Sequence, residues 1–88
     1  MTSEFTRVGT NNIQSLEGFT VTWRPTGGLD YTDEQGAIFV ESELLLKPLR
    51  VLIYPRSGGL RALPEVRAEE IVERIVRALE YLGYQVER

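Results

Sequence analysis

Few side chains in this sequence are suited to covalent chemistry. The 88 residues include no His and no Cys, so the commonest general base, the commonest metal ligand and the thiolate nucleophile are all missing. Ser57 lies in an Arg-Ser-Gly-Gly run, but a serine nucleophile needs a neighbouring base, and no motif places the single lysine, Lys47, beside it. We therefore expect no catalytic residue, no metal ligand and no cofactor.

The acidic residues are the other candidates for chemistry. Paired carboxylates can act as acid and base on a glycosidic bond or bind a hard cation. The acids that could converge across one hairpin are Asp30, Asp33, Glu34, Glu41 and Glu43. No calcium-loop spacing is present, and a chain of this length seldom encloses a substrate cleft. We expect these acids to solvate turns and strand edges, and an enzyme that uses carboxylates alone is only our third hypothesis.

Residues 54–61, Tyr-Pro-Arg-Ser-Gly-Gly-Leu-Arg, form the strongest candidate for recognition. Tyr and Arg are favoured at binding hot spots, and loops on a rigid sheet often carry binding residues. The Gly-Gly pair between two arginines could also bind a phosphate, although the run does not match a P-loop. The partner-binding residues that we predict are Tyr54, Arg56, Arg61, Arg50, Asp33 and Glu34.

Charge is unevenly distributed along the chain. The net charge is -3, yet the segment Lys47–Arg67, here called the basic segment, carries five basic residues and one acid. Aromatic side chains on a basic surface can stack on bases, so Trp23 and Tyr54 support an alternative function as a single-stranded nucleic-acid-binding regulator. The acidic total opposes this alternative, and we do not expect nucleic acid as the partner.

The elements that position these residues follow from periodicity. Alternating apolar and polar residues over 18–54 predict a β-meander, with a turn at Pro25-Thr26-Gly27-Gly28. Residues 1–17 are weakly patterned and read as a weakly ordered lead-in, and Leu44, Leu45 and Leu46 break the alternation as a bulge or a bend would. Residues 55–63 are expected to form a flexible loop.

The second half ends in one helix and one strand. Apolar residues at three- and four-residue steps predict an amphipathic helix over 64–82, with Pro64 in its first turn and Gly83 after its end. A short strand over 84–87 follows. Strands grouped before one helix indicate an α+β fold, in which an antiparallel β-meander of four to five strands carries the helix on one face.

Length and composition set the broad class. A chain of 88 residues forms a single domain, and no apolar run approaches the roughly 20 residues of a membrane span. The N-terminus shows no signal peptide, which together with the absence of Cys favours a cytoplasmic protein. So small a core gives marginal stability, which leaves homodimerisation open.

Four pieces of the second half form a recognisable set. They are Glu-Leu-Leu at 43–45, Val-Leu-Ile-Tyr-Pro-Arg-Ser at 51–57, Ile-Val-x-x-Ile-x-x-Ala-Leu at 71–79 and Leu-Gly-Tyr-Gln-Val-Glu at 82–87. With them the chain resembles a family of small bacterial immunity proteins of polymorphic toxin systems. At 58–61 this chain has Gly-Gly-Leu-Arg in place of the family's aromatic-proline stretch.

The resemblance implies a non-enzymatic inhibitor that binds a cognate toxin in the producing cell. Acidic residues of the N-terminal half could mimic the substrate of a basic toxin. The function that we predict is therefore a small non-enzymatic protein-binding module, with an immunity-like inhibitor as its specific form.

Overall fold

The structure is a computed structural model that describes residues 4–9, 11–24 and 27–88. The larger sheet follows chain order: β1 (Phe5–Val8), β2 (Asn12–Ser15), β3 (Thr20–Trp23), β4 (Leu29–Asp33) and β5 (Gly36–Val40). The smaller sheet has the order β6 (Ser42–Leu45), β7 (Arg50–Ile53) and β8 (Gln85–Glu87). A short 3-10 helix, η1 (Gly58–Ala62), and the α-helix α1 (Glu65–Tyr81) connect β7 to β8. The predicted α+β class, with an antiparallel sheet, one helix and a closing strand, is confirmed.

The larger sheet is antiparallel throughout and buries one face. Ile13 lies opposite Val21, Val21 opposite Tyr31, and Tyr31 opposite Ile38, so these side chains form one row across the sheet. Ile13, Val21 and Tyr31 are all at most 2% exposed. The alternation predicted for β3 is confirmed, because Phe19 and Val21 are buried and Trp23 packs against the core. Of the predicted turn, Pro25 and Thr26 lie outside the described residues.

The N-terminal residues differ from the predicted lead-in. β1 and β2 pair antiparallel and continue the larger sheet, with Phe5 opposite Ser15. Phe5 is buried, and its ring lies 6.0 Å from that of Phe19 and 5.4 Å from that of Tyr81. Each strand has four residues and only one buried side chain, so the alternation is too short to be recognised from the sequence.

The expected single meander is divided into two sheets. The chain leaves the larger sheet after β5 and enters the smaller one at β6, so that the run of leucines continues as a strand instead of a bulge. β6 and β7 are antiparallel, whereas the closing strand β8 is parallel to β7. The parallel pairing requires a long connection, which η1 and α1 provide.

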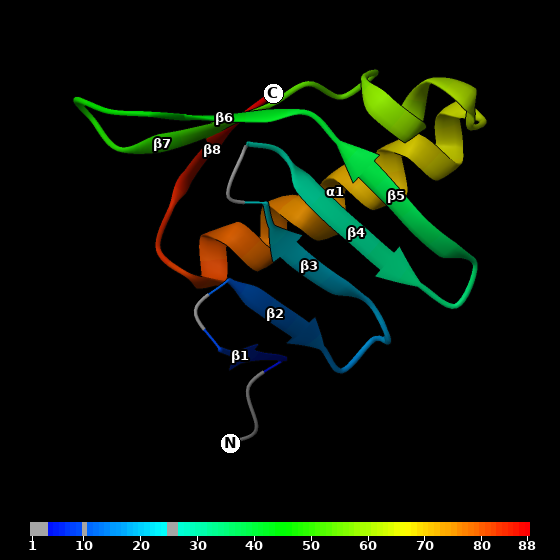
Figure 1. Ribbon diagram of the computed structural model, residues 1–88, viewed down its shortest axis with the longest axis horizontal. Helices are drawn as coiled ribbons and strands as arrows, with labels where there is room; N and C mark the ends of the chain where they lie inside the picture. The colour runs from blue at the N-terminus through cyan, green and yellow to red at the C-terminus, as the bar shows by residue number, and fades with distance from the viewer. Residues whose placement is uncertain (1–3, 10, 25–26) are drawn as a thin grey trace.

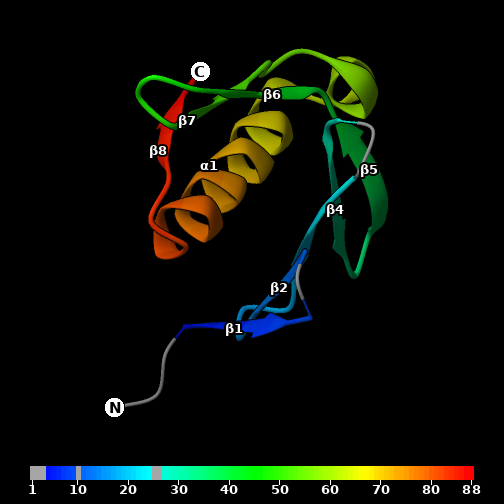
Figure 2. The ribbon, with the colours of Figure 1, turned by 60° about the vertical axis from the view of Figure 1, so that its left-hand side comes forward.

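α1 lies between the two sheets, as Figures 1 and 2 show together. Its buried residues recur at helical spacing and are Ala68, Ile71, Val72, Ile75, Ala78 and Leu79. They share one core with the buried faces of both sheets, including Val51 and Ile53 of β7. Within the described residues, no helix has the length and apolar character that crossing a membrane requires.

Candidate protein-binding surface

Asp33, one of the predicted partner-binding residues, is used inside the molecule. Its side chain is only 5% exposed and accepts hydrogen bonds from the Tyr31 hydroxyl at 2.7 Å and from the Gln35 backbone N–H at 2.8 Å. Arg67 and Arg74 of α1 approach the same carboxylate oxygen, at 2.5 Å and 3.4 Å. Asp33 therefore fastens α1 to the end of β4 and is not available to a partner, contrary to our prediction.

The protonation of this buried cluster is set by its own partners. Burial acts to raise the pKa of Asp33, but hydrogen bonds from Arg67 and Tyr31 outweigh it, and the pKa lies below its ordinary value of 3.8. Burial raises the pKa of Tyr31, and the hydrogen bond to the phenol oxygen raises the pKa of Arg74. A carboxylate that stays ionised among arginines is suited to ion pairing and poorly suited to proton transfer.

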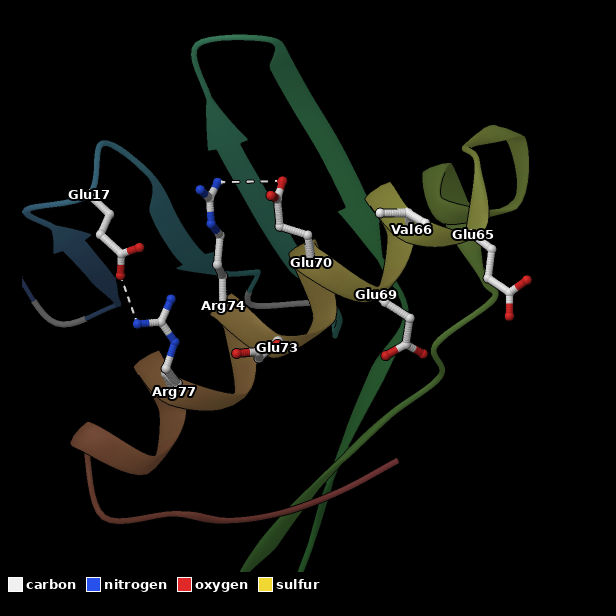
Figure 3. Close-up of a pocket in the computed structure, with 8 residues that line it drawn as sticks. All are labelled: Glu17, Glu65, Val66, Glu69, Glu70, Glu73, Arg74 and Arg77. Atoms are coloured by element: carbon white, nitrogen blue, oxygen red, sulfur yellow. Dashed lines mark hydrogen bonds and ion pairs between the residues drawn. The ribbon is translucent and has the colours of Figure 1, made fainter.

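The outer side of α1 bears an open acidic hollow of about 670 Å³. Figure 3 shows the eight residues that line it, namely Glu17, Glu65, Val66, Glu69, Glu70, Glu73, Arg74 and Arg77. Both arginines are already paired, Arg77 with Glu17 at 2.7 Å and Arg74 with Glu70 at 4.0 Å. The hollow is therefore a negatively charged surface that joins α1 to the β2–β3 turn.

The predicted loop, residues 55–63, contains the 3-10 helix η1, and hydrogen bonds join its start to neighbouring segments. The buried Ser57 hydroxyl donates to the Tyr54 carbonyl at 2.6 Å and accepts the Glu41 backbone N–H at 3.2 Å. Gly58 has φ +54, and a Cβ there would lie 2.4 Å from the Phe39 carbonyl oxygen. The Gly-Gly pair thus serves close packing on β5, which gives a structural reason for these residues without a phosphate.

The remaining predicted residues lie on different parts of the surface. Tyr54 is 40% exposed at the end of β7, Arg56 and Arg61 are exposed beside and within η1, and Glu34 is exposed in the β4–β5 turn. Arg50 of β7 is partly buried, and its Nε lies 3.4 Å from Glu87 of β8.

The basic segment does not gather into one patch. Two of its five basic residues, Arg50 and Arg67, are in ion pairs. Lys47 lies in the β6–β7 turn, and Figure 1 shows that turn and η1 at opposite ends of the molecule. The basic segment therefore provides no continuous basic surface for nucleic acid.

The β6–β7 hairpin, residues 42–53, is the most unusual surface feature. Figure 1 shows its turn projecting beyond the larger sheet. Three of its leucines are exposed, Leu44 by 50%, Leu46 by 69% and Leu49 by 49%. Apolar groups exposed together on a small protein mark an interaction site. We call this element the leucine hairpin; its only signal in the sequence was the leucine run that no alternation explained.

A groove of about 400 Å³ lies beside the leucine hairpin. Leu44, Trp23 and Tyr84 form its apolar walls, and the rings of Trp23 and Tyr84 lie edge to face at 6.0 Å. Ser42 also lines the groove, and its buried hydroxyl has no hydrogen-bond partner among the described residues. The apolar surface of the hairpin thus continues onto the body of the protein.

The leucine hairpin also presents an unpaired strand edge. β6 is the outer strand of its sheet as described, with β7 on one side only. The Tyr54 backbone N–H donates to the Glu41 carbonyl at 3.0 Å, and antiparallel ladders alternate, so the N–H and C=O groups of Ser42 and Leu44 point away from β7. Such an edge is a template for another strand.

The described residues contain no group of three or more carboxylates arranged to hold a metal ion.

The comparisons with known proteins add no relative. No family model, no curated protein and no solved structure matches this chain.

Proposed function

We propose that this chain is a small non-enzymatic protein-binding module whose binding surface is the leucine hairpin. The observation that carries the proposal is the exposure of Leu44, Leu46 and Leu49 on a projecting hairpin with a free strand edge. Fully burying a leucine contributes about 1.5–3 kcal/mol, so covering these half-exposed side chains would contribute on the order of 3 kcal/mol. A partner strand on β6 would add backbone hydrogen bonds and orientation.

Residues near the hairpin can supply a polar rim. Tyr54 lines a second hollow, of about 430 Å³, which shares Ser42 with the groove beside Leu44. Binding surfaces commonly combine an apolar centre with a polar rim, and Tyr and Arg are enriched in interfaces relative to the rest of the surface. Two of the predicted partner-binding residues support this rim, because Arg50 belongs to β7 and Tyr54 directly follows it.

The specific form of the proposal is an immunity-like inhibitor of a cognate toxin. The resemblance of the second half supports it, and the acidic hollow on α1 suits a basic partner. The test is co-expression with a toxin-like reading frame found directly beside this gene. Protection of growth that is lost in the Leu44→Ser, Leu46→Ser, Leu49→Ser variant supports the proposal. Equal protection by that variant would show that another surface binds the toxin.

The general proposal is tested by site-specific photo-cross-linking in the cell of origin. A benzophenone amino acid at position 46 should capture a protein, because Leu46 is 69% exposed at the hairpin. The matched control is position 8, since Val8 is 44% exposed at the end of β1 and lines neither the groove beside Leu44 nor the acidic hollow. Equal capture at both positions, or none at position 46, would contradict the assignment of the binding surface.

A further inference from the structure

We propose that the leucine hairpin binds a second copy of this chain, with two β6 edges paired antiparallel across a two-fold axis. The inference rests on the proposed function, because it names the occupant of the same surface. Pairing would join the two smaller sheets into one six-stranded sheet and would remove the free edge that each copy presents.

Symmetry restricts the register of such a pair. With a two-fold axis perpendicular to the sheet, a given side chain points to the same face of the sheet in both copies. Residues that lie opposite one another also point to the same face, so their residue numbers must be both odd or both even. An axis through residue 43 would place Glu43 against Glu43 of the second copy, which like-charge repulsion opposes. An axis through residue 44 would place Ser42 against Leu46 and Glu43 against Leu45, which sets a polar side chain against an apolar one at both positions.

An axis through Leu45 gives complementary pairs at each position. Leu45, the last residue of β6, then lies opposite Leu45 of the second copy. Leu46 and Lys47 begin the β6–β7 turn and come beside Leu44 and Glu43 of the second copy; Lys47, with φ 64, contributes its side chain and no ladder bond. Leu44 directs its backbone groups to the free edge, where they face Leu46, the first turn residue, of the second copy. The register therefore matches apolar with apolar side chains and negative with positive ones.

The charges of the hairpin are free to make these contacts. Glu43 and Lys47 are both exposed, and neither forms an ion pair within the part of the chain that the structure describes. Because the hairpin projects from the body (Figure 1), two copies can meet there while the acidic surfaces of α1 stay apart.

The surface is small, so we expect a weak dimer. One hairpin edge with its leucines falls at the low end of specific interfaces, which corresponds to a dissociation constant of about 1–100 µM. Sedimentation equilibrium of the full chain from about 1 µM to about 1 mM measures this range directly. The parent should change from monomer to dimer, and Leu44→Ser with Leu46→Ser should weaken the dimer at least tenfold. Val66→Ser is the matched control and should leave it unchanged.

Charge reversal tests the register itself. Glu43→Lys or Lys47→Glu alone should weaken the dimer by about tenfold, since each places like charges opposite one another. The double variant should restore the parental constant, a rescue that a merely structural role of these residues would not produce. Circular dichroism melting of every variant shows that it is folded.

The outcomes separate this inference from the proposed function. A parent that stays monomeric to about 1 mM overturns self-association. If the cross-linker at position 46 then captures a different protein, the proposed function stands; if it captures nothing, both are overturned. A dimer that is indifferent to the leucine and charge variants also overturns the inference.

Discussion

Replacing Asp33 with Asn tests whether the buried ionic cluster fastens α1 to the sheet. The carboxylate accepts from Tyr31, from a backbone N–H and from Arg67, and Arg74 lies 3.4 Å away. Asn keeps the size of the side chain but removes its charge and turns an NH₂ donor toward groups that also donate. The variant removes the buried counter-ion of Arg67 and Arg74 and leaves them only Glu70, which is 49% exposed, as a shared partner.

The magnitude follows from the burial of the partners. Removing one partner of a buried ion pair costs about 3–5 kcal/mol. Here the Arg67 and Arg74 side chains are 15% and 22% exposed, so water can solvate part of the charge that loses its partner. We expect a loss of about 2–3 kcal/mol, which for a domain of this size lowers Tm by about 10–20 °C.

The assay is urea or thermal unfolding followed by circular dichroism, with Asp30→Asn as the matched control. Asp30 pairs with Arg24 at 2.8 Å, but the two side chains are 33% and 47% exposed. Exposed pairs contribute about 0–1 kcal/mol, so this control should remain close to the parent. If the two variants lose the same stability within about 0.5 kcal/mol, the reasoning about the buried cluster is wrong.

The same cluster predicts a pH dependence. The pKa of Asp33 is lower in the folded protein than its ordinary value of 3.8, so ionised Asp33 stabilises the fold above that value. This contribution is lost as the pH falls through the depressed pKa, because the folded and unfolded states then bind the same proton. The difference in stability between the parent and Asp33→Asn should therefore be full near neutral pH and shrink in strong acid. A difference that is constant with pH would contradict the assigned role of the charge.

Three further expectations concern the loop and the alternative function. Gly58→Ala should lower the free energy of unfolding by more than about 2 kcal/mol, because its Cβ would meet the Phe39 carbonyl. Gly9→Ala is the control, because Gly9 has φ +72 but a Cβ there would meet no atom within 4 Å. It should lower the free energy of unfolding by only about 1 kcal/mol, which is the effect of the positive φ alone. Ser57→Ala should cost about 1 kcal/mol, since it removes two hydrogen bonds; no change in Tm would contradict this. Anisotropy titration with single-stranded DNA should show no binding that weakens with salt, and micromolar salt-dependent binding would revive the nucleic-acid alternative.

Part of the candidate site was visible in the sequence. Its signal was the run Leu44, Leu45 and Leu46, whereas the predicted residues Arg56, Arg61 and Glu34 are exposed on other parts of the surface. Asp33 was placed with them because an acid next to a turn is ordinarily solvated. Its burial depends on Arg67, which is 34 residues away, and no local pattern contains that information.

The elements with a clear period were predictable from the sequence. α1 was predicted over 64–82 and spans Glu65–Tyr81, because a helix repeats its burial every 3.6 residues along 17 residues. The closing strand was predicted over 84–87 and forms as Gln85–Glu87. Periodicity records which side of an element meets the core, and this is a local property of the chain.

The tertiary structure alone decided how the elements share the core. It divided the strands into two sheets, made β8 parallel to β7, and left Leu44, Leu46 and Leu49 exposed on a projecting hairpin. Whether a leucine is buried depends on which distant element covers it, and α1 has only one apolar face, which the core already occupies. Burial of a side chain is a property of the assembled molecule, so the sequence can indicate an apolar residue but not what covers it.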